Sequence, residues 1–97
     1  MSAKEEEVVR RLVRKLLDEE YTISVYNGGD GSEIGRSSDY DKIVKELFAT
    51  DYEELHVHKG DYNSVVILIY GNAEDGSEVI ADYSGSLEDL IKSVEGR

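Results

Sequence analysis

The sequence predicts a single α+β domain over residues 1–97, with about five strands in a mainly antiparallel sheet and three helices. The expected element order is α-β-β-α-β-β-β-α. One observation behind this fold class is the stretch 65–70, which is apolar or aromatic at six consecutive positions between turn residues and is typical of a central strand. The other is that three further stretches carry apolar residues at helical spacing, between shorter segments with strand character.

The first helix is expected over residues 3–20, followed by a strand at 21–26, a glycine-rich loop at 27–32 and a short strand at 33–36. Opposite charges recur four residues apart on the polar side of this helix, so its basic cluster is interpreted as a solvated, self-paired face. The apolar stripe consists of Val8, Val9, Leu12, Val13, Leu16 and Leu17, and the expected pairs are Glu6–Arg10, Glu7–Arg11, Arg14–Asp18 and Lys15–Glu19.

The second helix is expected to begin at Ser38, with Asp41 completing a capping box, and to end by residue 50. A third strand at 53–59 leads through the two-residue turn Gly60-Asp61 into the central strand. A second hairpin connection at 71–77 precedes a fifth strand at 78–83, and Ser86 is expected to cap the last helix.

The central strand is apolar on both sides, which raises the question of what covers each face of the sheet. Each helix carries one narrow apolar stripe, so we expect all three to lie on the face that presents Val66, Leu68 and Tyr70. The opposite face would then present Val65, Ile67 and Ile69, flanked by His56, His58 and Ile80. Burying three such β-branched side chains stabilises a complex by roughly 5–8 kcal/mol, so we predict an interface there. The alternative is that one helix crosses over and covers the opposite face, which would leave a monomer without an exposed apolar patch.

The sequence does not specify the partner at this predicted interface, which is either a second copy of the chain or another protein. Tyr62 is expected to contribute to it as a partly exposed aromatic residue. His56 and His58 are expected at its rim, where their protonation near pH 6 would weaken the association.

The sequence offers no complete catalytic or metal-binding set, and no cofactor is expected. His56 and His58 are weak metal candidates: they point to one face of a strand, but the neighbouring strand supplies no third ligand. Ser64 is the nearest candidate nucleophile, and in the expected register it points away from both histidines.

The charge of the chain is −11, which disfavours nucleic acid as a ligand because acidic groups repel a phosphate backbone. The chain has no cysteine and no apolar run of membrane-spanning length, so we expect a cytoplasmic protein without membrane contact. It also has no proline, whereas natural chains average about 5%, and this favours a redesigned sequence.

Several short segments resemble a group of small uncharacterised proteins from bacteria and their phages. The resemblance implies a fold and no activity, and it weakens at residues 27–35 and at the His-Val-His of residues 56–58. The segments that carry it are TISVY at 22–26, RSSD at 36–39, LFATD at 47–51, IYGN at 69–72, VIADY at 79–83 and LED at 87–89.

Taken together, these features predict a small acidic domain that binds a protein and is not an enzyme. The sequence is also compatible with three different functions: a redesigned scaffold for binding, an acidic mimic of DNA, and a small metal-dependent hydrolase.

Overall fold

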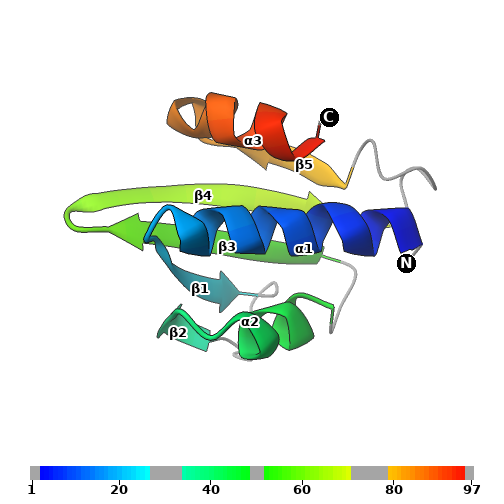
Figure 1. Ribbon diagram of the computed structural model, residues 1–97, viewed down its shortest axis with the longest axis horizontal. Helices are drawn as coiled ribbons and strands as arrows, with labels where there is room; N and C mark the ends of the chain where they lie inside the picture. Colours follow the sequence, from blue (N-terminus) through cyan, green and yellow to red (C-terminus); the bar gives the residue numbers. More distant parts are fainter. Residues whose placement is uncertain (1–2, 27–33, 49–51, 71–78, 96–97) are drawn as a thin grey trace.

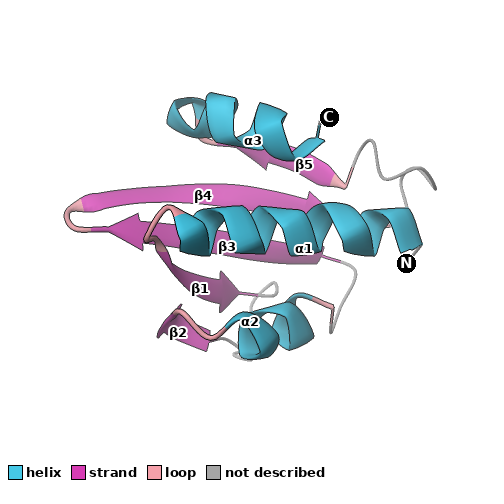
Figure 2. Cartoon of the chain, viewed as in Figure 1, coloured by secondary structure: helices cyan, strands magenta, loops and turns pink. Residues whose placement is uncertain are grey.

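The computed structural model describes residues 3–26, 34–48, 52–70 and 79–95 of the chain. It confirms the α+β class, with three helices packed against a sheet (Figure 2). The elements are α1 (Ala3–Asp18), β1 (Thr22–Tyr26), β2 (Ile34–Ser37), α2 (Tyr40–Leu47), β3 (Tyr52–Lys59), β4 (Tyr62–Ile69), β5 (Ile80–Tyr83), a short 3-10 turn η1 (Gly85–Leu87) and α3 (Glu88–Glu95).

The strands form one antiparallel sheet in the order β2-β1-β3-β4-β5. Its centre is the hairpin of β3 and β4, which pair over their whole length from Tyr52↔Ile69 to Lys59↔Tyr62. The predicted Gly60-Asp61 turn joins them, and Gly60 has a φ of 62°, which a residue without a Cβ adopts at no steric cost. The expected loops at 27–32 and 71–77 lie outside the described residues.

All three helices lie on one face of the sheet, as predicted. Helix α1 crosses the middle of the sheet over β3 and β4, with α2 beside β1 and β2 and α3 beside β5 (Figure 1). The core between the layers joins the apolar stripe of α1 to the inward-facing residues of the strands. Its fully buried members include Val9, Leu12, Val13, Leu16, Ile23, Val25, Leu55, Val57, Val66 and Leu68.

Two helix starts differ from the sequence prediction. The N-cap of α2 is Asp39 rather than Ser38: the Asp39 side chain accepts a hydrogen bond from the backbone N–H of Lys42 at 3.3 Å. The last helix is preceded by η1, and the Ser86 hydroxyl pairs with the Tyr62 hydroxyl instead of capping α3. In both places several consecutive residues have capping chemistry, so the sequence alone does not choose among them.

Helix α1 ends in a Schellman motif that uses an unusual residue. The N–H of Tyr21 donates to the carbonyl of Leu16 at 3.0 Å, and the N–H of Glu20 donates to the carbonyl of Leu17 at 3.0 Å. Glu20 therefore occupies the left-handed position, with a φ of 73°. This position normally holds glycine, because a Cβ there costs roughly 1–2 kcal/mol.

The core also contains carboxylates, which the sequence did not predict. Glu5 on α1 is 1% exposed and Glu53 on β3 is 0% exposed. Next to β4, the buried Tyr70 hydroxyl donates to the Leu47 carbonyl at 2.8 Å and so ties the end of the central strand to α2. Burial raises the pKa of Tyr70, and the charges of Glu53 and Glu5 raise it further, so this hydroxyl keeps its proton and remains a donor.

No helix among the described residues is long and apolar enough to cross a membrane.

Paired substitutions in β4 test which face of the sheet is covered. Leu68 is fully buried, so Leu68→Asp places a carboxylate in the core at a cost of several kcal/mol, against a total stability of about 5–15 kcal/mol. We expect this variant to be largely unfolded and Ile67→Asp, on the uncovered face, to remain folded. Circular dichroism melts will compare the two, and a cooperative melt of Leu68→Asp near the parent temperature would contradict the assignment.

Replacing the left-handed residue at the end of α1 should stabilise the protein. We expect Glu20→Gly to raise the free energy of unfolding by about 1 kcal/mol, or roughly 4–8 °C in Tm for a domain of this size. The matched control is Glu20→Ala, which removes the same charge but keeps the Cβ, so its Tm should stay close to that of the parent. Equal gains from both variants would show that charge, not backbone strain, is responsible.

Candidate functional site

The candidate functional site is the face of the sheet that the three helices leave uncovered, here called the open face. The strand registers place its residues in rows across β1, β3, β4 and β5. The open face consists of Thr22, Ser24, Tyr26, Tyr52, Glu54, His56, His58, Asn63, Val65, Ile67, Ile69 and Asp82.

The centre of the open face is the apolar row Val65, Ile67 and Ile69, as predicted. These side chains are half-buried by their cross-strand neighbours, so less apolar surface is exposed than the sequence suggests. Glu54 lies opposite Ile67 on one side and Asp82 lies opposite it on the other, so the middle of the row is flanked by two carboxylates.

Two expected members of this surface lie on the other face. Ile80 is 7% exposed and faces the core opposite Leu68, because a register shift between Ile67 and Leu68 turns the start of β5 inward. Tyr62 packs against the core as well, with its ring 6.0 Å from that of Tyr21. The exposed aromatic residues of the open face are instead Tyr26 and Tyr52, each 39% exposed.

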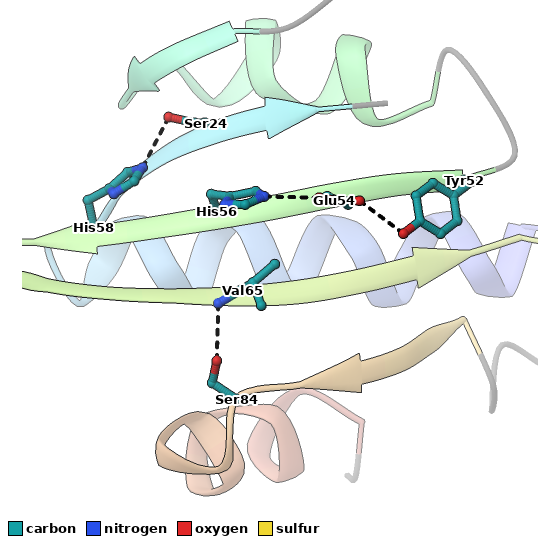
Figure 3. Close-up of polar contacts among 7 residues, drawn as sticks. All are labelled: Ser24, Tyr52, Glu54, His56, His58, Val65 and Ser84. Carbon is teal, nitrogen blue, oxygen red and sulfur yellow. Dashed lines mark hydrogen bonds and ion pairs between the residues drawn. The ribbon is translucent and has the colours of Figure 1, made fainter. Parts of the chain in front are cut away.

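A chain of polar contacts runs along β3 on the open face (Figure 3). The Tyr52 hydroxyl donates to Glu54 Oε2 at 3.0 Å, and Glu54 Oε1 lies 3.2 Å from His56 Nε2. An ionised carboxylate only accepts, so His56 carries a proton on Nε2. The His56 and Tyr26 rings also meet in a T-shaped arrangement, with ring centroids 4.6 Å apart.

These contacts hold Glu54 in its charged form. The hydrogen bond from His56, and then that from Tyr52, lower the pKa of Glu54. A carboxylate whose pKa is lowered on folding stabilises the protein at every pH above its unfolded-state pKa. This contribution is lost as the pH falls through the lower pKa of the folded state. Glu54 is therefore a persistent negative charge beside the apolar row.

A second chain of hydrogen bonds links β1, β3 and β4. Its last residue, Asn63, determines which atom donates and which accepts at each step. Asn63 Nδ2 donates to the Asp61 carbonyl at 3.5 Å, which leaves Asn63 Oδ1 to accept from His58 Nδ1 at 2.6 Å. His58 Nε2 is then an acceptor for the Ser24 hydroxyl at 3.1 Å (Figure 3). The order is that of a nucleophile, a base and a residue that orients the base.

The serine that reaches a histidine is Ser24, which the sequence did not single out, rather than Ser64. Ser64 lies opposite Val57 and so faces away from the histidines, as predicted. Ser24 is 34 residues from His58 in sequence, so the contact between them depends on the pairing of β1 with β3. However, Ser24 is only 3% exposed, and its strand is paired on both sides, which occupies the backbone N–H groups that would stabilise an oxyanion. We interpret this chain as one that orients His58.

The two histidines have different partners, which bears on metal binding. His56 Nε2 faces Glu54, whereas both ring nitrogens of His58 are engaged by Ser24 and Asn63. The described part of the chain contains no group of three or more histidine, cysteine, aspartate or glutamate side chains arranged to hold a metal ion.

The edge of the open face is closed by Ser84. The Ser84 hydroxyl accepts from the Val65 N–H at 3.2 Å, and the Ser84 N–H donates to the Val65 carbonyl at 3.1 Å (Figure 3). Ser84 thus continues the pairing of β4 beyond the end of β5, so the backbone groups of Val65 are not available to a ligand.

On the other side of the molecule, the basic cluster of α1 is largely as predicted. One expected pair is missing: Arg14 and Asp18 form no ion pair, and the Arg14 guanidinium instead lies 4.4 Å from the centre of the Tyr40 ring. The pairs present are Glu6–Arg10 at 3.8 Å, Glu7–Arg11 at 3.4 Å and Lys15–Glu19 at 3.5 Å.

No family model matches the chain, and neither a curated protein nor a solved structure matches it. The resemblance to small bacterial and phage proteins stays a prediction, and the surfaces of the molecule are the basis on which a function can be proposed.

Zinc should leave the stability of the protein unchanged. Among the described residues of the open face, His56 and His58 are the only imidazole ligands, and two ligands without a third bind zinc weakly. We expect the Tm in a small molar excess of Zn²⁺ to equal that in EDTA. A rise of several degrees that disappears in His56→Ala would contradict this expectation.

Proposed function

We propose that the chain is a small acidic protein-interaction domain that binds its partner through the open face of the sheet. The observation that carries this proposal is the row Val65, Ile67 and Ile69, which no helix of the described chain covers. On the same face, Tyr52 lies opposite Ile69 and Tyr26 lies one strand further away, and each is 39% exposed. Tyrosine is favoured at protein interfaces because it combines apolar area with a hydroxyl.

The charges around the row define the chemistry of the partner. Glu54 and Asp82 flank Ile67 on both sides, and the chain as a whole carries −11. A complementary segment presents apolar side chains to the row and lysine or arginine to the two carboxylates. The negative field of the protein also speeds the encounter with such a partner.

The size of the open face favours transient binding. Five strands span about 24 Å, and the longest strands, β3 and β4, have eight residues or about 26 Å, so the sheet plane measures at most roughly 600 Å². This is below the ~800 Å² that each partner buries in a stable protein complex. A peptide segment or small domain therefore suits the surface better than a permanent subunit.

A basic partner is also favoured over a second copy of this chain. Two copies would each bring a charge of −11 to the interface, and their carboxylates would meet like charges. A redesigned scaffold for binding would use the same surface. A DNA mimic has only the overall charge of −11 in its favour, and a metal-dependent hydrolase would need a group of metal ligands, which the described part of the chain does not contain.

A defined peptide tests the proposal. We expect a synthetic hexapeptide of alternating lysine and valine to shift the backbone NMR signals of β3 and β4 around the open face, with a dissociation constant in the micromolar to millimolar range that rises with salt. Ile67→Lys should abolish these shifts. Asp82→Asn should weaken binding severalfold, whereas the matched variant Asp89→Asn, at an exposed position on α3, should not.

Sedimentation of the parent and of Ile67→Lys will separate the possible occupants. A parent that is monomeric at high concentration agrees with the proposal. A parent dimer that Ile67→Lys dissociates would assign the open face to a second copy instead. Peptide-induced shifts on the helical side would exclude the open face as the binding surface.

A further inference from the structure

A second candidate site lies on the opposite side of the molecule, on the outer surface of the helices. It is a hollow of about 420 Å³ formed by the polar side of α1 together with Tyr40 at the start of α2 and Ser93 on α3. Among the described residues, four cationic side chains line it, Arg10, Arg11, Arg14 and Lys15, together with one carboxylate, Asp18. In a chain with a charge of −11, such a concentration of cations needs an explanation.

Part of the explanation is that the arginines fasten the helices together. The Arg11 Nε donates to the Val94 carbonyl at 3.2 Å, which links α1 to the last turn of α3. The Arg10 guanidinium lies 5.3 Å from the centre of the Phe48 ring, at the end of α2. These two arginines have carboxylate partners on α1, and Lys15 pairs with Glu19 just after the helix, so the three charges are largely compensated.

Arg14 differs from the other three cations. Among the described residues it forms no ion pair. Its guanidinium instead makes a cation–π contact with Tyr40, with its central carbon 4.4 Å from the centre of the ring. A cation–π contact with the face of a ring uses none of the N–H donors of the guanidinium. Tyr40 therefore holds the Arg14 guanidinium at the hollow without occupying the donors that a ligand would need.

We propose that the hollow binds a small phosphate monoester, with Arg14 as the residue that receives the phosphate group. The planar fork of arginine matches two phosphate oxygens at once, and Arg14 is the cation of this hollow that has no carboxylate partner among the described residues. The volume is within the range of small-molecule sites and exceeds what a phosphate ion fills, so the organic part of the ligand lies against Tyr40 and Val94.

A neighbouring hollow sets the orientation of the ligand. It measures about 310 Å³, shares Lys15 and Ser93 with the first, and is lined by Glu19 and Asp89. These carboxylates repel a dianion and keep the phosphate at the Arg14 end. The acidic groups elsewhere on the chain act weakly at physiological ionic strength, where the Debye length is about 8 Å.

Titration with phenyl phosphate, followed by ¹⁵N NMR at 0.15 M NaCl, tests the proposal. We expect saturable shifts at the Arg14 Nε–H and at the amides of α1 around it and of Ser93, with inorganic phosphate binding at the same place more weakly. Arg14→Gln should weaken binding at least tenfold. Arg14→Lys, which keeps the charge but not the fork, should give an intermediate loss.

The matched control is Lys45→Gln, which removes one positive charge from an exposed position on α2 that does not line the hollow. Its affinity for phenyl phosphate should remain within twofold of the parent. Equal losses in Lys45→Gln and Arg14→Gln would overturn the proposal, because they would show non-specific attraction. Equal binding of benzoate and phenyl phosphate would overturn the assignment to phosphate. The spectrum of each variant shows whether it is folded, and Arg14→Lys serves if Arg14→Gln is not.

Discussion

The architecture depends on a shortage of apolar helix surface. Each of the three helices has one apolar stripe, and a stripe contributes to stability only when it is buried. The face of the sheet formed by Leu55, Val57, Val66 and Leu68 is the one that offers a continuous apolar surface, and α1 lies across its centre. Once the three helices are packed there, no helix in the described chain is left to cover the other face. The open face is therefore a consequence of helix number and stripe width.

An uncovered β-sheet face must satisfy its polar groups without a second layer, and the two polar chains on the open face do this. Glu54 is paired with His56 and Tyr52, and His58 is held between Ser24 and Asn63. The same contacts give the two histidines different hydrogen-bond partners, although the residues lie only two positions apart on one strand. A metal ion could bind one of these imidazole nitrogens only by displacing the hydrogen-bond partner of that nitrogen. The networks therefore favour recognition by shape and charge over metal chemistry.

The central hairpin was predictable because side chains alternate between the two faces of a strand and because the residues of the turn were recognisable in the sequence. The Gly60-Asp61 turn fixes the register of β3 against β4, so the facing of His56 to Val65 and of Ser64 away from both histidines followed from counting residues. The contact of Ser24 with His58 did not follow, because it requires knowing that β1 pairs with β3. Ile80 was misplaced because a bulge shifts the register by one residue, which moves a side chain to the other face. Glu53 was missed because alternation predicts the facing of a residue but not whether a carboxylate there is tolerated.

The two candidate surfaces are separated by the whole core and have opposite chemistry. The open face combines an apolar row with Glu54 and Asp82, whereas the outer side of α1 collects arginine and lysine. A cation-bearing partner and an anionic ligand would thus bind on opposite sides without competing. Communication between them would have to pass through α1, whose residues Leu12 and Leu16 are fully buried against the sheet. Close-packed cores resist small displacements, so a ligand that draws Arg14 outward does work against this packing rather than shifting the sheet. The two binding events should therefore be nearly independent in free energy.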